Sequence, residues 1–276
     1  MRAFLAGVSL AILVAAVPAQ AASAKGPTKM SADAQFEAIY TKEWAWRIAQ
    51  FGRQDGKGVD AHLPKADPAT QDMRQHYWEG VLKDVQAVPR EKLSPRQQVN
   101  YDVYIPQLQT LIADQKFRTY EMPANSDSQF WSGFGEDNSG FKTEQDYKNW
   151  ISQMRDIPRF FDDETAEMKA GLVRGFTPPQ VTLQGRDKSI SNVLNAKPED
   201  TSFYKPFKDM PGVAPERQAA LRAEAVSVIR DTVQPAYSTL LKFWNEDYVP
   251  GARKTLAADV LPDGKAFYGS EILEYT

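Results

Sequence analysis

The sequence predicts a mostly α-helical protein: a multi-helix array of long, proline-kinked helices with extended loops and at most one or two short strands. Apolar residues recur at helical spacing through most of the chain. Several of these stretches open with Asp-Pro or Ser-Pro, as helices often do. Only residues 177–183 alternate apolar and polar residues, which allows one short strand or an extended connection. Cysteine is absent, so the core must form without disulfides.

Residues 1–21 have the features of a secretory signal peptide. Arg2 supplies a positive charge, residues 3–17 are apolar, and residues 19–21 form an A-x-A cleavage signal. The alternative is a membrane anchor, but the apolar run is shorter than the ~20 residues that cross a bilayer. We expect cleavage after Ala21, export to the periplasm or the medium, no membrane attachment afterwards, and a single helical domain over residues 22–276.

Three helices are expected in the first half of that domain. The first follows Ser31, the second opens at Asp67 and ends before Pro89, and the third opens at Ser94 and is kinked at Pro106. The apolar residues that recur at helical spacing are Phe36, Ile39, Tyr40 and Trp44 in the first helix, Met73, Tyr77, Val81 and Val85 in the second, and Val99, Val103, Leu108, Leu111 and Ile112 in the third.

Two stronger helices are expected further along the chain. Thr143 and Asp146 resemble a capping box that opens a long helix, bent at Pro158 and ending near Gly175. A proline-rich loop covers residues 197–215. The clearest helical pattern then runs from Leu221 to Trp244, with a kink expected at Pro235.

Residues 122–141 predict a long ordered loop between these two groups of helices. At its centre, residues 130–135 (the aromatic loop) contain Phe130, Trp131 and Phe134 beside two glycines. Flat rings give contact area at low entropic cost and glycine permits close approach, so these three residues are the candidate substrate-binding residues. The alternative is that the rings fill the helical core.

The remaining chemistry is sparse. The two histidines are His62, in a Gly/Pro-rich loop, and His76, which shares a predicted helix face with Glu79. Neither belongs to an H-E-x-x-H motif, so the residues predict no metal ligand and no catalytic residue. A net charge of −3 gives no reason to expect nucleic acid as a partner.

One run of carboxylates leaves a further possibility open. Asp162, Asp163, Glu164 and Glu167 lie on one predicted helix, where burial could tune an acid and base pair. The plainer interpretation is a solvated face, since Arg155, Arg159 and Lys169 are near enough in sequence to offset the charge. A complete enzyme with an unfamiliar carboxylate site is therefore the third hypothesis for function.

Several short stretches together resemble a bacterial, often exported family known as domain of unknown function 885. They are GFTPP with Val181 (residues 175–181), YVPGAR (248–253), LPDGKAFY (261–268) and EYT (274–276), and residues 93–94 leading to NYD (100–102) fit as well. The resemblance implies a helical zinc metallopeptidase, a dipeptidase or carboxypeptidase acting on peptides. Members are about twice this length, with a His-Glu motif and a Pro-Gly-His-His stretch in the second half. Neither motif occurs here, so no zinc ligand can be assigned.

The last residues restart an amphipathic pattern at Phe267 and stop within it at Thr276. We therefore expect this chain to be the N-terminal half of a larger two-half fold, either as a natural truncation or as a fragment. Its partner would be the missing C-terminal half. The first hypothesis is the scaffold and substrate-groove portion of an exported zinc peptidase-like protein, inactive alone and binding no cofactor itself. The alternative is a stand-alone periplasmic binding or interaction protein without catalysis.

Overall fold

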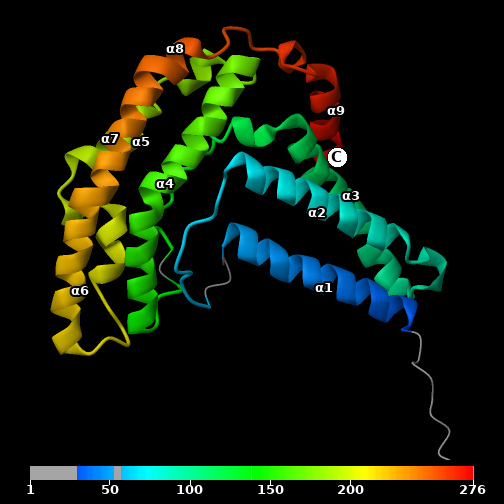
Figure 1. Ribbon diagram of the computed structural model, residues 1–276, viewed down its shortest axis with the longest axis horizontal. Helices are drawn as coiled ribbons and strands as arrows, with labels where there is room; N and C mark the ends of the chain where they lie inside the picture. Colours follow the sequence, from blue (N-terminus) through cyan, green and yellow to red (C-terminus); the bar gives the residue numbers. More distant parts are fainter. Residues whose placement is uncertain (1–29, 53–56, 138, 276) are drawn as a thin grey trace, which may run out of the picture. The chain divides into compact units, whose positions relative to one another are not determined.

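A computed structural model describes residues 30–52, 57–137 and 139–275, and no strand occurs among them. Residues 32–276 form one compact unit. The prediction of a mostly α-helical array is confirmed (Figure 1). The signal-peptide prediction concerns residues that lie outside the described ones. The helices are α1 (Ala32–Phe51), α2 (Pro68–Gln86), α3 (Pro95–Phe117), α4 (Glu144–Arg174), α5 (Asp187–Asn195), α6 (Pro215–Val228), α7 (Gln234–Phe243), α8 (Val249–Gly251) and α9 (Gly264–Tyr275).

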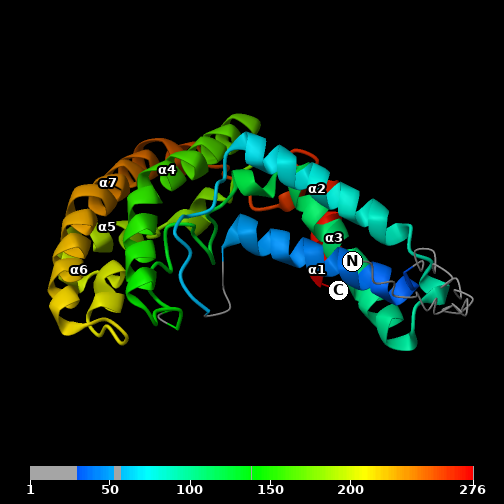
Figure 2. The same ribbon diagram turned by 60° about the horizontal axis from the view of Figure 1, so that its bottom comes forward.

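The helices of the compact unit form two groups. α1, α2 and α3 pack on one another, while α4 packs on α6 and α7, and α5 packs on α7 (Figures 1 and 2). α9 returns to lie against α3. The short strand considered for residues 177–183 does not form, because Gln180–Leu183 is a 3-10 turn whose first N–H donates to the carbonyl of Arg253.

The helix starts follow the caps that the sequence predicts. The Asp67 carboxylate accepts hydrogen bonds from the backbone N–H and the hydroxyl of Thr70, at 3.0 and 2.8 Å. At the start of α4 the capping box is present, with the Thr143 N–H donating to Asp146 at 2.8 Å. Both α3 and α4 continue as helices through Pro106 and Pro158.

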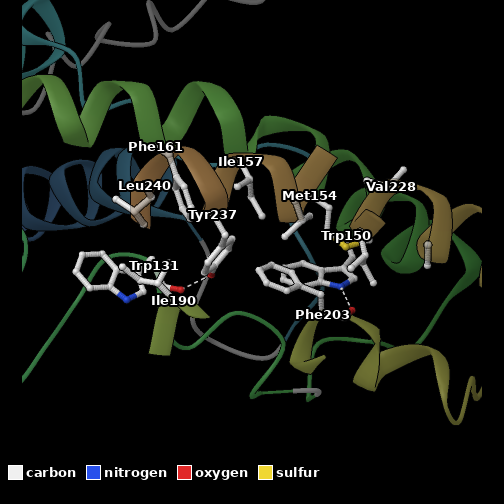
Figure 3. Close-up of a cluster of buried hydrophobic side chains, with 14 of the residues drawn as sticks. Trp131, Trp150, Met154, Ile157, Phe161, Ile190, Phe203, Val228, Tyr237 and Leu240 are labelled. Carbon is white, nitrogen blue, oxygen red and sulfur yellow. Dashed lines mark hydrogen bonds between the residues drawn. The ribbon is translucent and has the colours of Figure 1, made fainter. Parts of the chain in front are cut away.

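The larger core lies between α4, α6, α7 and the 3-10 segment Ser202–Phe207 (Figure 3). Two of its aromatic residues are fixed by hydrogen bonds to backbone carbonyls. The Trp150 indole N–H donates to the carbonyl of Phe203 at 2.9 Å, and the Tyr237 hydroxyl donates to the carbonyl of Trp131. Polar atoms that are buried with rings need such partners, so these bonds set the orientation of the rings.

Two π-helical turns explain how the last long helix continues past its prolines. The two turns are Ile229–Val233 and Trp244–Tyr248. Each is closed by a hydrogen bond from the N–H of the residue just before a proline to the carbonyl five positions earlier. The donors are Gln234 in the first turn and Val249 in the second. Proline cannot donate to the carbonyl four residues earlier and its ring clashes with that carbonyl. The wider turn relieves the clash, so the helix is not ended at Pro235.

A second core joins α1, α2 and α3, and it contains a buried carboxylate that the sequence did not indicate. Glu43 is 1 % exposed and accepts hydrogen bonds from Arg47 at 2.8 Å, Trp78 Nε1 at 3.0 Å and Tyr104 at 3.1 Å. These donors come from all three helices. The carboxylate therefore links the three helices at one point.

Some predicted apolar stripes are displaced from the buried faces. Trp44, Met73, Val99 and Val103 are exposed. In α2 the buried face instead includes the polar residues Gln71 and Arg74. A prediction that follows only apolar residues cannot locate a buried helix face that contains polar residues. The predicted buried face of α2 was therefore wrong in part.

Candidate functional site

A cavity of about 730 Å³ lies where the connection between α1 and α2 passes the aromatic loop and α4. One wall is formed by residues 58–60 and 62–64, which belong to the segment 58–66 that we call the pinned segment, and another wall is formed by the aromatic loop. α4 contributes Trp150, Gln153 and Phe160. This space, called the aromatic cavity below, is of the size that small-molecule and peptide side-chain sites have.

The polar face of α4 holds the pinned segment in place. Asn149 donates to the carbonyl of Val59 at 2.7 Å, and Gln153 donates to the carbonyl of Asp60. One helical turn later the Asp156 carboxylate accepts the N–H of Leu63 at 3.0 Å. Side chains of a helix thus satisfy the backbone of an extended segment, in the way that a neighbouring strand would.

The same pattern continues toward the end of the segment. Arg159 donates to the carbonyls of Leu63 and Pro64 at 2.9 and 3.1 Å, and it pairs with Asp163 at 2.8 Å. The residues of α4 that take part recur every three or four positions, which puts them on one face of the helix. The sequence predicts a Gly/Pro-rich loop around His62, but it contains no indication that α4 holds this loop in place.

Asp146 fixes the other end of the pinned segment. Its carboxylate accepts the N–H groups of Val59, Lys142 and Thr143 at 3.2, 3.1 and 2.8 Å. Burial opposes the charge of this group, but the hydrogen bonds from Thr143, Lys142 and Val59 outweigh it and lower the pKa of Asp146. The capping residue of α4 is therefore also the anchor of the cavity wall.

The aromatic loop divides between the cavity and the core. Phe130 and Phe134 are partly exposed and line the aromatic cavity. Trp131 is 2 % exposed and lies behind them, with its indole N–H donating to Ser189 at 2.9 Å. Two of the three candidate residues thus face the cavity, and the third has the core position that the alternative interpretation expected. Ligand binding by any of them stays a prediction.

Packing fixes the two rings that face the cavity. Phe134 stacks on Phe203 with ring centroids 5.4 Å apart, and Phe130 meets Phe161 edge-on at 5.4 Å. Gly135 follows with φ of 72°, and a side chain there would overlap the carbonyl oxygen of Ser202. The loop therefore needs glycine at this position both for its backbone conformation and for close approach.

The two histidines occupy separate environments. His62 lines the aromatic cavity, and its Nδ1 lies 3.0 Å from an Asp156 oxygen. His76 lies on α2 with Nδ1 at 2.7 Å from the carbonyl oxygen of Asp72. Among residues 30–52, 57–137 and 139–275, no three His, Cys, Asp or Glu side chains converge as a metal site requires. The zinc ion implied by the family resemblance does not fit this part of the chain.

Comparison with known proteins decides the family. A profile described as "Bacterial protein of unknown function (DUF885)" matches residues 47–276. The chain belongs to the DUF885 family. No curated protein matches this DUF885 member. A solved structure of a "putative lipoprotein" from Colwellia psychrerythraea is similar, with a TM-score of 0.68 and 14 % identity over 88 % of this chain and 46 % of that one. The DUF885 chain thus spans about half the length of that relative and shares its fold.

No helix in the described part of this DUF885 chain combines the length and the apolar character that crossing a membrane requires.

A second cavity, of about 450 Å³, lies between α2, α3 and α4 of the DUF885 chain, and we call it the polar cavity. It shares Phe51, Pro64 and Phe160 with the aromatic cavity, so the two spaces lie next to one another. Arg74, a residue that sequence reasoning did not single out, lines it and is 4 % exposed. The guanidinium packs over the ring of Phe51 at 4.3 Å.

The carboxylate run on α4 is only partly the solvated face of the plainer interpretation. Asp162 is exposed, but Glu164 is half-buried and Glu167 is 4 % exposed. Burial, and then the nearby Glu121 and Asp67, raise the pKa of Glu167 to about 7. No hydrogen-bond donor reaches its Oε1 among the described residues.

Glu167 should make stability depend on pH. Because its pKa is higher in the folded chain, its contribution is fully present below the unfolded value of about 4.5 and is lost as the pH rises through about 7. Glu167→Gln removes this titration. At pH 5 the variant should match the parent, and at pH 8 it should be more stable by about 2 kcal/mol. Urea unfolding at the two pH values measures this; an equal difference at both would contradict it.

Proposed function

We propose that this chain is the scaffold and one wall of the substrate groove of an exported zinc peptidase-like protein, and that it is inactive alone. The observation that carries the proposal is the aromatic cavity, whose walls are fixed by α4 before any ligand arrives. Membership in DUF885 and a length about half that of a solved relative support it. The proposed ligand is a peptide.

A peptide suits the chemistry of the cavity lining. Phe130, Phe134 and Trp150 provide flat apolar surface for a side chain, and Asp60 and His62 provide polar groups on another wall. Apolar walls with a few polar groups are typical of sites that bind and orient such ligands. Preformed walls also reduce the entropic cost of binding.

The hydrolytic step would need groups beyond the described ones. A catalytic zinc site needs three protein ligands and an open position for water. Since the described residues do not provide that set, we assign to this chain the binding and orientation of substrate and no step of bond cleavage. Export follows from the predicted signal peptide, and it would place the protein in the periplasm or the medium.

Phe134→Ala tests this proposal. Isothermal titration of residues 22–276 with a set of tripeptides that contain an aromatic residue should detect binding. The substitution should weaken it about tenfold, because one ring of the cavity wall is lost. Tyr268→Ala removes an exposed ring on α9 and should leave affinity unchanged. With zinc added, the chain should hydrolyse none of these peptides above background. Unchanged affinity in Phe134→Ala, or robust zinc-dependent turnover, would overturn the proposal.

The alternative function is a stand-alone periplasmic binding protein without catalysis. It is favoured by the fact that both walls of the aromatic cavity lie within this chain. The DNA sequence beyond codon 276 distinguishes the peptidase portion from the stand-alone binding protein. A coding segment with a His-Glu motif and a Pro-Gly-His-His stretch would support the peptidase portion, and unrelated sequence would support the binding protein.

A further inference from the structure

A third cavity, of about 410 Å³, lies between α1 and α3, and we call it the α1–α3 cavity. It shares no lining residue with the aromatic cavity or the polar cavity. Phe36 and Glu43 are 0 and 1 % exposed, so they form its floor. Trp44 and Val103 are 58 and 55 % exposed, so they stand at its rim. The volume lies in the range of small-molecule sites.

Three aromatic rings of the α1–α3 cavity contact one another. Phe36 meets Tyr40 edge-on with ring centroids 5.2 Å apart, and Tyr104 lies 6.0 Å from Phe36 and 6.4 Å from Tyr40. Trp44 follows Tyr40 by one helical turn on α1 and adds a fourth ring at the rim. Because the rings come from both helices, helix packing fixes this apolar surface in advance. An aromatic ligand would find ring surface on more than one side.

The charges at the α1–α3 cavity balance one another. Among the described residues that line it, two are charged, Glu43 and Arg47. Arg47 Nε donates to Oε1 of Glu43 at 2.8 Å, so each charge already has its partner. An ion of either sign would lose its hydration beside a pair that has no net charge left to offset this loss. The cavity therefore favours a neutral ligand.

Arg47 still has hydrogen-bond donors to offer. A guanidinium has five N–H groups, and Arg47 uses Nε for Glu43, while no hydrogen bond joins its two terminal nitrogens to another of the described residues. The guanidinium carbon lies 5.8 Å from the centroid of the Trp44 ring. A ligand ring that packs on Trp44 would thus bring an attached acceptor close to these donors. Hydrogen bonds from a charged donor are stronger than those between neutral groups.

We propose that the α1–α3 cavity binds a small neutral molecule with an aromatic ring and an attached carbonyl group, of which an aromatic amide is the simplest kind. The ring packs against Tyr40, Trp44 and Tyr104, and the carbonyl oxygen accepts from a terminal nitrogen of Arg47. Binding also removes the exposed apolar surface of Trp44 and Val103 from water. This site is separate from the aromatic cavity, so the inference does not rest on the proposed function.

Calorimetric titration of residues 22–276 with benzamide at pH 7.5 tests the inference. Benzamide should bind. Benzoate and benzylamine keep the ring but carry a negative and a positive charge, and each should bind about tenfold more weakly. Acetamide keeps the carbonyl without the ring, and it should also bind about tenfold more weakly. No binding of benzamide at millimolar concentration, or equal affinity for any of these three compounds, would overturn the inference.

A matched pair of variants on α3 tests where benzamide binds. Val99 and Val103 lie one helical turn apart and are 62 and 55 % exposed, but Val103 lines the α1–α3 cavity and Val99 does not. Val103→Asp places a carboxylate at the rim, where the ligand would cover it, so benzamide should bind about tenfold more weakly. Val99→Asp makes the same change outside the cavity and should leave the affinity unchanged. If Val103→Asp had no effect, benzamide would bind elsewhere on the chain, and the inference would be wrong.

Two further measurements complete the test. Trp44→Ala removes the ring at the rim and should also weaken benzamide binding about tenfold. Thermal unfolding checks that each variant folds. The other occupant that an exposed apolar rim suits is a second copy of the chain. Sedimentation should find a monomer with and without Val103→Asp, and a dimer that this variant dissociates would overturn the inference in favour of self-association.

Discussion

Gly135→Ala is expected to lower the free energy of unfolding by about 3 kcal/mol and to abolish peptide binding in the aromatic cavity. The φ of 72° at Gly135 is unfavourable for any residue with a Cβ. The added carbon would also overlap the carbonyl oxygen of Ser202, which belongs to the backbone and cannot rotate away. Strain and overpacking each cost about 1–3 kcal/mol, which together give the expected loss.

Gly133→Ala is the matched control for that experiment. Gly133 lies two residues earlier in the same loop and also has a positive φ, of 84°, but a Cβ there meets no neighbouring atom. We expect a loss of about 1 kcal/mol from backbone strain alone. Chemical denaturation and peptide titration of both variants measure the difference. Equal effects would show that close approach to Ser202 does not hold the loop.

Glu43→Ala is expected to destabilise the chain by about 3 kcal/mol. The substitution leaves the buried Trp78 indole N–H and the Tyr104 hydroxyl without an acceptor, and it frees the guanidinium of Arg47. Removing one member of a buried charged network leaves its partners desolvated and unpaired, which is the expensive outcome. Urea unfolding followed by tryptophan fluorescence measures the loss.

Two variants test the cause of that loss. Glu37→Ala removes an exposed carboxylate from the same helix and should change stability by less than about 0.5 kcal/mol. Tyr104→Phe removes one donor and should cost about 1 kcal/mol. If Glu43→Ala were no worse than Glu37→Ala, the carboxylate would not be the link between α1, α2 and α3.

Local signals in the sequence were enough to predict most of the fold. Asp67 and the Thr143–Asp146 pair mark helix starts because capping depends on residues a few positions apart. The positions of the buried faces were harder to predict, since Arg74 and Glu43 are buried through partners on other segments. A π-helical turn precedes Pro235, and no local signal in the sequence pointed to it.

The site could be predicted only in part for the same reason. Phe130 and Phe134 stood out as rings beside glycines, and the structure brings both to a cavity. Trp131 has the same local signals, but its indole and carbonyl find partners in Ser189 and Tyr237, far along the chain. The pairing of α4 with the pinned segment carries no local signal, because each of its polar residues is also typical of an exposed helix face.

The pinned segment also bears on how the chain folds. The hydrogen bonds that hold it join residues 87 to 97 positions apart, so they can form only after α4 exists and after a long loop has closed. Contacts of this kind slow folding and form late. During synthesis, residues 58–66 emerge from the ribosome well before their partners on α4. Their hydrogen bonds to α4 therefore cannot form until α4 has emerged as well. The aromatic cavity is therefore expected to form after the α2–α3 pair, whose two helices are neighbours in the sequence.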